Sequence, residues 1–398
     1  MSVTAFIGAG AALNIGGPTT NALTNAIKLR QQWDGVPNSK VKVPAIQQIA
    51  DALDQHFAPE SANFEDVFHA VESLISLRAG GTAKAFKPAI GAFVKPTAAA
   101  NHSNTTLIQA GDHIIDEVAN HIVSYVNGFA PHAAHQWFSR FWQEATSRCP
   151  WDIATLNYDN CIEQSLGTSV WEDGYALLDP GICRFDPSQI VNSTRTRMLH
   201  LHGSVFYGYP RFTTPNRFLF EDHHEDLYRF DSHVDARRNW FGRSRNQAQS
   251  GERATAGPII TGQRKPDKLL GLPYSTYQAV FHDALLKNPR LLIVGYSFGD
   301  LHFNHLLSRI TRIHNDNRRV VVVDHVRPEM RAPNWIPNAW PPFVIGRHLT
   351  TLSRGTLPVD GHYANPWVSG DERCRVYLEG FQDAAQNHGT DIINFLTT

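Results

Sequence analysis

The chain of 398 residues has few cysteines and no bias of charge. Its four cysteines are far apart, and no Cys-x-x-Cys pair occurs; they are Cys149, Cys161, Cys183 and Cys374. This spacing excludes a four-thiolate zinc site and a disulfide framework, and it favours a reducing compartment. The 36 Lys and Arg residues nearly balance the 37 Asp and Glu residues. A net charge of −1 gives no overall attraction to nucleic acid or to an anionic membrane.

Long hydrophobic runs are also missing. The N-terminal stretch Met-Ser-Val-Thr-Ala-Phe-Ile has no basic region followed by a long apolar segment, so we expect no signal peptide. No apolar stretch is long enough to span a bilayer, and we expect a cytoplasmic protein without membrane contact. The apolar content of 42% is sufficient for a substantial core. The length allows several domains or one large α/β domain with insertions.

Apolar runs that end in small or polar residues dominate what is present. The runs at 4–7, 151–158, 196–202, 290–298 and 319–324 are predicted to be strands, and helical patterns separate them. This alternation predicts an α/β protein with a doubly wound, parallel, Rossmann-like sheet. Small or polar residues at or just past the ends of the runs are Gly8 and Gly10, Asn157 and Asp159, His202, Ser297 and Asp300, and Asp324. Parallel strands end at one edge of a sheet, which is where such sheets bind ligands.

Other segments are predicted to decorate this sheet. Residues 44–150 are mostly helical in pattern and form a helical insertion, and residues 205–270 form a polar insertion. Within the polar insertion, 210–256 is expected to be irregular and not sheet. The tail at 372–397 is expected to contain a helix through Val376, Leu378 and Phe381. The predicted division is a catalytic domain at 1–325 and a C-terminal extension at 326–398.

Two short segments suggest a ligand site on their own. His202 ends an alternating stretch, Met198 to His202, and Gly203 permits either a sharp turn or the close approach of another group. A core histidine without function is the alternative for His202. Gly8 and Gly10 follow the first strand, where glycine lets backbone N–H groups approach a pyrophosphate. A plain tight turn is the alternative there, because Leu13 replaces the third glycine of the dinucleotide fingerprint.

Five motifs together resemble the sirtuin family. They are Gly8-Ala9-Gly10, Thr155-Leu156-Asn157-Tyr158-Asp159, Leu201-His202-Gly203, Gly295-Tyr296-Ser297-Phe298-Gly299-Asp300 and Val323-Asp324, in the order that sirtuins have them. The resemblance covers roughly residues 4–325. The chain resembles the bacterial sirtuin-like NAD hydrolases of anti-phage defence more than it resembles deacetylating sirtuins. These hydrolases pair with an Argonaute or a HerA-type ATPase, or act in Thoeris-type systems.

The resemblance implies a role for each matched position. His202 would be the catalytic histidine, and Asn157 would orient the nicotinamide ribose or a water. The residues implied to bind NAD are Gly8, Ala9, Gly10, Asn14, Thr155, Asp159, Gly295, Ser297, Asp300 and Asp324. Among them, Gly8 to Gly10 would hold the pyrophosphate, and Asp324 would meet the adenosine ribose.

Two departures from deacylating sirtuins shape the functional expectation. The span 205–270, where the deacylases carry a four-cysteine zinc module, contains no cysteine. The loop Ala11-Ala12-Leu13-Asn14 lacks the Ser and Arg of the deacylase loop. The resemblance therefore implies a metal-free NAD glycohydrolase with NAD as its substrate. We expect a homo-oligomer that a protein partner activates, with 44–150 and 326–398 as candidate contact surfaces.

The chemistry of NAD cleavage agrees with these residue types. Loss of nicotinamide passes through an oxocarbenium-like state, so the site needs orientation and polar groups more than a strong acid. A neutral histidine can accept a proton at physiological pH, and an asparagine can donate and accept hydrogen bonds at once.

Several alternatives remain open at this stage. The crevice would also suit a non-catalytic sensor of NAD or ADP-ribose, or an NAD-dependent protein deacylase. Ser297 in Gly-Tyr-Ser-Phe-Gly fits a nucleophile elbow, with Asp324 as the acid and His348 or His362 as the base. The cluster Asp222-His223-His224-Glu225 and the basic run around Arg237 and Arg238 are interpreted as solvated surface.

Overall fold

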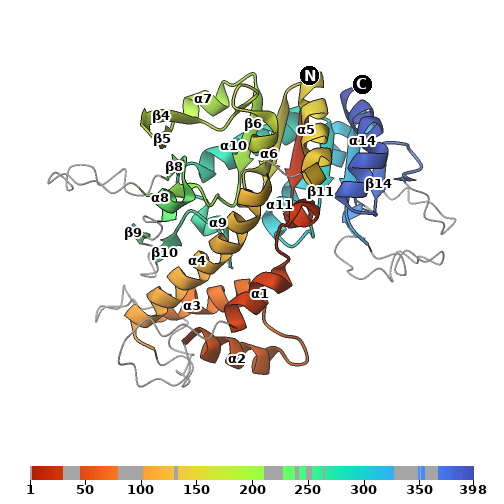
Figure 1. Ribbon diagram of the computed structural model, residues 1–398. Coiled ribbons are helices and arrows are strands. Elements are labelled where there is room, and N and C mark those ends of the chain that lie inside the picture. The colour runs from red at the N-terminus through yellow and green to blue at the C-terminus, as the bar shows by residue number, and fades with distance from the viewer. Residues whose placement is uncertain are drawn as a thin grey trace.

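The computed structural model describes residues 2–29, 45–78, 102–129, 133–209, 227–237, 242–247, 253–262, 265–326, 348–349, 351–354 and 366–398. It is a mixed α/β structure with a largely parallel central sheet. A lobe of helices projects from one end of the sheet (Figure 1).

The central sheet has eight strands in the order β13-β14-β12-β11-β1-β2-β6-β3. Their bounds are β1 (Val3–Ile7), β2 (Trp151–Thr155), β3 (Trp171–Glu172), β6 (Thr196–His200), β11 (Arg290–Val294), β12 (Arg319–Val323), β13 (Trp367–Val368) and β14 (Cys374–Tyr377). All neighbouring pairs are parallel except β13 with β14. Taken in chain order, the six strands from β6 to β14 have the order 3-2-1-4-5-6, which is consistent with a Rossmann-like sheet.

Helices cover both faces of this sheet. The helices are α1 (Thr20–Leu29), α2 (Ala45–Phe57), α3 (Phe64–Arg78), α4 (Asn104–Phe129), α5 (Gln136–Arg148), α6 (Cys161–Leu166), α7 (Pro187–Val191), α8 (His233–Arg237), α9 (Lys265–Lys268), α10 (Tyr274–Lys287), α11 (Leu301–Leu307), α12 (Arg309–His314) and α14 (Phe381–Thr397), with short 3-10 turns η1 (Ala9–Ile15), η5 (Ala133–His135) and η7 (Asn315–Asn317). On one face Val3, Ala5 and Ile7 join a core that includes α5 and α14. On the other, Phe6 lies 5.3 Å from the rings of both Phe281 in α10 and Phe303 in α11.

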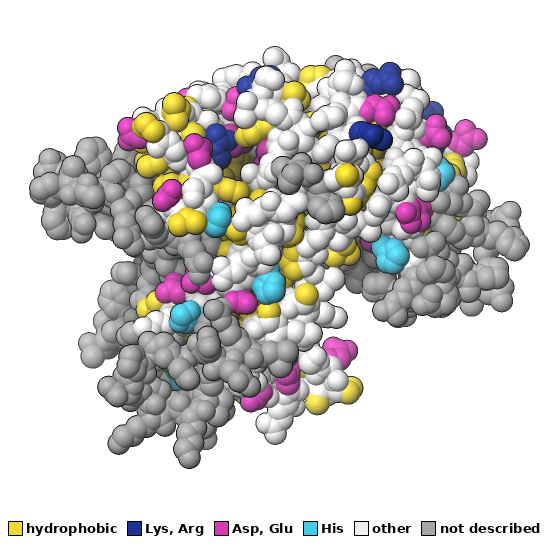
Figure 2. All heavy atoms as spheres, in the orientation of Figure 1, with side chains coloured by type: hydrophobic (Ala, Val, Ile, Leu, Met, Phe, Trp, Pro, Cys, Tyr) yellow, Lys and Arg dark blue, Asp and Glu magenta, His cyan; other side chains and the backbone are white. Residues whose placement is uncertain are grey.

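The predicted helical insertion divides between the lobe and the sheet. Helices α2 and α3 pack with α1 and α4 in the lobe, and α4 continues from the lobe to the sheet (Figure 1). Helix α5 instead packs against α14 and α6 on the sheet. Its aromatic side chains surround Phe381, whose ring centroid lies 6.2 Å from that of Trp142. Charged side chains of both signs are scattered over the face shown in Figure 2.

Two predictions about local structure are wrong. Residues 374–377 form a strand and not a helix, because Cys374 and Val376 face one core while Tyr377 faces the other, which is the alternation of a strand between two layers. The span 210–256 is not wholly irregular. It contributes β8 (Tyr228–Phe230), β9 (Gly242–Gln247) and β10 (Arg253–Ala256). Strand β8 pairs with β5 (Ile182–Phe185) and β7 (Tyr207–Gly208) because Tyr228 and Phe230 are buried there.

A small antiparallel sheet results, in the order β4-β5-β8-β7, where β4 is Tyr175–Asp179. The predicted central strands are present, but three of them end two or more residues earlier than expected. Strand β2 ends at Thr155, β6 at His200 and β11 at Val294. The polar residues Asn157, His202 and Ser297 therefore lie in the turns that follow the strands, at one edge of the sheet.

Candidate active site

The site is built around the place where the chain changes direction across the sheet. From β1 the chain continues to β2 and β6 on one side, and it later returns to β11 and β12 on the other. The register aligns Ile7 with Thr155 and with Val294, so the loops after β1, β2 and β11 leave the sheet at one level. Divergent loops at such a switch point form the ligand crevice of open α/β sheets.

Glycines bring the loops after β1 and β11 into direct backbone contact. A Cβ on Gly8 would lie 2.5 Å from the carbonyl oxygen of Gly295, and a Cβ on Gly295 would lie 2.2 Å from the nitrogen of Ala11. Gly295 also has φ +60°, a conformation that favours glycine. The N–H of Gly10 donates to Gly295 O at 2.9 Å, and that of Gly8 donates to Val294 O. In this structure these two N–H groups bind protein, and their contact with a pyrophosphate stays a prediction.

A small cavity lies where the turn after β2 meets η1. Its polar lining consists of Thr155, Asn157, Asp159 and Glu163, and its apolar lining consists of Ile7, Ala11, Ala12, Ile15, Phe138, Ile162 and Met198. The volume of about 10 Å³ is close to that of one water site. The structure thus brings the predicted Asn157, Thr155 and Asp159 together with the first loop.

Asp159 is held by two protein groups. Tyr125 of α4 donates its hydroxyl proton to Asp159 Oδ2 at 2.5 Å, and the N–H of Cys161 donates to Oδ1 at 3.0 Å. The second bond forms an Asx turn that leads into α6, whose N-cap is Asn160. Asp159 therefore anchors the turn that carries Asn157, and its predicted contact with nicotinamide stays a prediction.

His202 lies past β6 in a buried, charged environment. The side chain is 3% exposed, and its Nε2 is 4.0 Å from Asp300 Oδ2. Nε2 has no hydrogen-bond partner within the described part of the chain. Burial, helped by the charge of Lys265, lowers the pKa of His202 to about 3 against the opposing effect of Asp300. The imidazole is therefore neutral at physiological pH. It is not part of the wall of the small cavity.

Residues 257–261, within the polar insertion, cover the His202 turn. Gly203 has φ +91°, and a Cβ there would lie 1.8 Å from Pro258 O, so both predicted reasons for glycine apply. Ile260 donates its N–H to His202 O at 2.8 Å, and Ser204 donates its N–H to Pro258 O at 3.0 Å. A single β-bridge, between Gly203 and Ile259, also joins this segment to the turn.

Charged residues that the sequence did not single out complete this environment. Lys265 Nζ lies 2.9 Å from Asp300 Oδ1 and 3.2 Å from Glu65 Oε1 of α3. These carboxylates raise the pKa of Lys265 although its burial lowers it. Lys268 similarly lies 2.7 Å from Glu72 Oε1. Nothing in the sequence pairs these residues, since α3 and α9 are about 200 positions apart.

The remaining predicted residues lie along the same edge. Ala9 and Asn14 are exposed in η1, and Ser297 is exposed in the loop after β11. Asp324 follows β12, and burial raises its pKa to about 6, although the N–H of His325 donates to the carboxylate.

The nucleophile-elbow alternative lacks the expected backbone strain at Ser297. Positive φ occurs at Phe298, φ 56°, and not at the serine. The ring of His348, one of the two candidate bases, stacks on Phe298 at 4.7 Å. His362 and the cluster at 222–225 lie outside the described residues.

In the parts of the chain that the structure describes, no group of three or more His, Cys, Asp or Glu side chains is arranged to hold a metal. No described helix combines the length and the hydrophobicity that crossing a membrane requires.

A comparison with protein families matches part of the chain. Residues 152–337 match the SIR2-like domain. The match spans just under half of the chain, from β2 to beyond β12, and includes Asn157, His202, Ser297 and Asp324. It supports the sirtuin-like resemblance and an NAD-related activity, because SIR2-like domains use NAD and are commonly NAD-dependent enzymes. No curated protein matches the chain.

Proposed function

We propose that this chain is an NAD glycohydrolase that releases nicotinamide and ADP-ribose. The proposal rests on the residues that meet at the edge of the sheet, at the switch point. There, Asn157 lines a cavity beside the first loop, and the neutral His202, whose Nε2 makes no hydrogen bond to the described residues, follows the next strand. We also infer that the sheet is doubly wound, since each of its faces carries helices.

In the proposed mechanism, the loops on either side of the switch point hold NAD. Gly8 to Gly10 and Asn14 lie at the pyrophosphate, Gly295 and Ser297 contact phosphate or ribose, and Asp324 accepts hydrogen bonds from the adenosine ribose. Nicotinamide leaves with the electron pair of its bond to the ribose, and water adds to the oxocarbenium-like ribose. Asn157 orients the reacting ribose or the water, and neutral His202 accepts a proton from a hydroxyl group.

The enclosure of His202 fits a regulated enzyme. The side chain is buried and residues 258–260 bond to the backbone around it, so NAD reaches it only when surrounding residues move. We infer low activity of the isolated chain and activation by self-assembly or by a protein partner. A HerA-type ATPase or a short Argonaute in a cytoplasmic anti-phage system is the partner that the sequence resemblance suggests.

The test is the amount of nicotinamide and ADP-ribose released from NAD by the purified chain, with and without the product of the neighbouring gene. We expect His202→Ala and Asn157→Ala each to lower release by about 100-fold or more while the fold is retained. His305→Ala provides the matched control, because His305 is an exposed histidine on α11. Undiminished release by both site variants would reject the proposed roles.

The buried imidazole also favours one second candidate, a sensor that binds NAD or ADP-ribose without cleaving it. Calorimetry of NAD binding, combined with the assay of nicotinamide release, separates the two functions. Saturable NAD binding with no nicotinamide released, even with the partner present, would establish the sensor. A deacylase would instead release acetylated ADP-ribose only when an acetyl-lysine peptide is added.

A further inference from the structure

Glu163 is an acidic side chain of the small cavity that the proposed mechanism leaves unused. It lies on α6, one turn after the Asn157–Asp159 turn, and it lines the cavity together with Asn157 and Thr155. The side chain is only 10% exposed. Most of the remaining wall is apolar, so a water in this space would find few polar partners besides these side chains.

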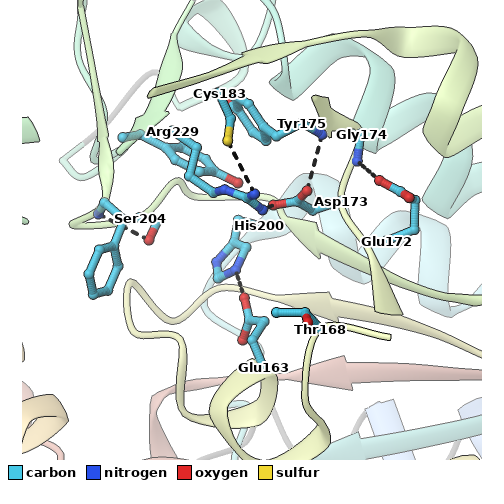
Figure 3. Close-up of polar contacts among 12 residues, drawn as sticks. Glu163, Thr168, Glu172, Asp173, Gly174, Tyr175, Cys183, His200, Ser204 and Arg229 are labelled. Atoms are coloured by element: carbon cyan, nitrogen blue, oxygen red, sulfur yellow. Dashed lines mark hydrogen bonds and ion pairs between the residues drawn. The ribbon is translucent and has the colours of Figure 1, made fainter. Parts of the chain in front are cut away.

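A buried histidine holds the Glu163 carboxylate in place. His200, the last residue of β6, places Nε2 2.5 Å from Glu163 Oε1 (Figure 3). Burial lowers the pKa of His200, but the charge of Glu163, with Asp159 and Asp173 nearby, raises it more. His200 thus donates its Nε2 proton to Oε1 in a charge-assisted hydrogen bond.

This arrangement leaves one carboxylate oxygen for a ligand. His200 is the one side-chain partner of Glu163 within the described residues, and it occupies Oε1. The adjacent Asp173 is already paired with Arg229, and Asp159 has both oxygens bound to protein. Glu163 is therefore the carboxylate of this cavity that retains an oxygen able to accept a proton.

We propose that Glu163 is the proton acceptor for the water that attacks NAD, that this water occupies the cavity between Glu163 and Asn157, and that His200 is a positioning residue for the carboxylate. The proposal rests on the proposed function and adds the residue that activates its nucleophile. The cavity volume of about 10 Å³ suits a single water.

The step balances without a metal or a redox partner. The water oxygen forms a bond to C1′ of the nicotinamide ribose as the bond from C1′ to the pyridinium nitrogen breaks. The electron pair of that bond neutralises nicotinamide, and one proton of the water passes to Glu163, from which it later returns to solvent. A carboxylate in this role beside an oxocarbenium-like centre follows the general logic of glycoside hydrolysis.

The experiment compares Glu163→Gln with wild type by nicotinamide release, by KM and by the Kd for NAD, under the conditions in which the wild-type chain is most active. We expect kcat to fall by about 100-fold or more, because glutamine keeps the hydrogen bonds but accepts no proton. KM and Kd should change less than about threefold. Glu172→Gln is the matched control; Glu172 binds Gly174 N and Arg195 outside the cavity, and full activity is expected.

Two further variants separate catalysis from folding. Glu163→Ala should regain activity when formate is added, because formate can take the place of the missing carboxylate. His200→Gln retains a donor at the carboxylate and should lower kcat with KM nearly unchanged, whereas a merely structural role would alter the melting temperature and KM together.

The outcomes distinguish the two proposals. A wild-type chain that cleaves NAD while Glu163→Gln cleaves it within about threefold of wild type overturns the role of Glu163 and leaves the glycohydrolase intact. Loss of activity in Glu163→Ala without rescue by formate also overturns the role of Glu163 as proton acceptor. A wild-type chain that binds NAD and never cleaves it overturns both.

Discussion

At the scale of single residues, the two histidines at the end of β6 show how position decides chemistry. His200 and His202 are two residues apart, yet the pKa of the first is raised and that of the second is lowered to about 3. The difference comes from their neighbours, because His200 meets Glu163 of α6, whereas His202 is buried near Lys265 of α9. The first is suited to hold a carboxylate in place, and the second is neutral at physiological pH.

The lowered pKa of His202 predicts a pH dependence of stability. Between pH 6.5 and about 3 the unfolded chain binds a proton at this residue that the folded chain does not, so the free energy of unfolding falls as the pH falls. The loss is about 1.4 kcal/mol per pH unit. His202→Gln should lack this component, as urea unfolding at pH 7 and pH 5 will show. An equal change in the free energy of unfolding between pH 7 and pH 5 in the two proteins would contradict the prediction. His200, whose pKa is raised, is present in both proteins and so does not affect the comparison.

Sequence reasoning singled out His202 and left His200 and Glu163 aside. The alternation Met198/His200/His202 placed both histidines on one side of a strand, and the turn glycine marked only the second. The partners come from helices that follow other strands, and a single sequence does not show which helix meets which strand end. For the same reason Lys265 and Glu65, which surround His202, were missed.

At the scale of secondary-structure elements, the contact between the loops after β1 and β11 defines the crevice. Gly8, Gly10 and Gly295 make this contact possible by leaving room for backbone against backbone. The sequence indicated the glycines of the first loop as phosphate ligands. Their first role in the structure is to let two distant loops touch.

Gly295→Ala should therefore disrupt the crevice. The added Cβ would lie 2.2 Å from Ala11 N on a residue with φ +60°, and the strain should lower stability by about 1–3 kcal/mol. We expect NAD binding measured by calorimetry to be lost or strongly weakened. Gly128→Ala in α4 is the control, since nothing lies within 4 Å of its added Cβ, and it should be neutral or stabilising. Unchanged NAD affinity in Gly295→Ala would contradict the importance of this contact.

Elements with long, regular patterns were predictable, and short ones were not. The continuous apolar runs of β11 and β12 correctly predicted strands that are buried between two layers. Strand β14, with four residues, and the small antiparallel sheet have too few residues for a periodic pattern to emerge. Their strand conformation is fixed by pairing, of β14 with β12 and of β8 with β5 and β7.

At the scale of the whole molecule, ion pairs connect the helical lobe to the site. Lys268 of α9 pairs with Glu72 of α3 and also donates to Thr261 O, and both charged side chains are largely buried. Lys265 makes the neighbouring link between α3 and Asp300. Movement of the lobe would therefore disturb the surroundings of His202.

A double-mutant cycle measures this connection. Lys268→Met leaves the Glu72 carboxylate buried without its cation, and we expect a loss of about 3 kcal/mol in the free energy of unfolding. Combining Lys268→Met with Glu72→Gln should cost less than the sum of the two single changes, because the unpaired charge is removed. Urea unfolding of the four proteins gives the coupling energy. Strict additivity would show that the two residues are not energetically linked.

The measurement that tests the central claim most directly is the mass balance of NAD incubated with the purified wild-type chain, alone and with the product of the neighbouring gene. Chromatography should show nicotinamide and ADP-ribose appearing in equal amounts as NAD disappears, many molecules for each protein chain. Quantitative recovery of intact NAD in both conditions, at concentrations where binding is saturated, would contradict the assignment of this crevice as a site of NAD cleavage.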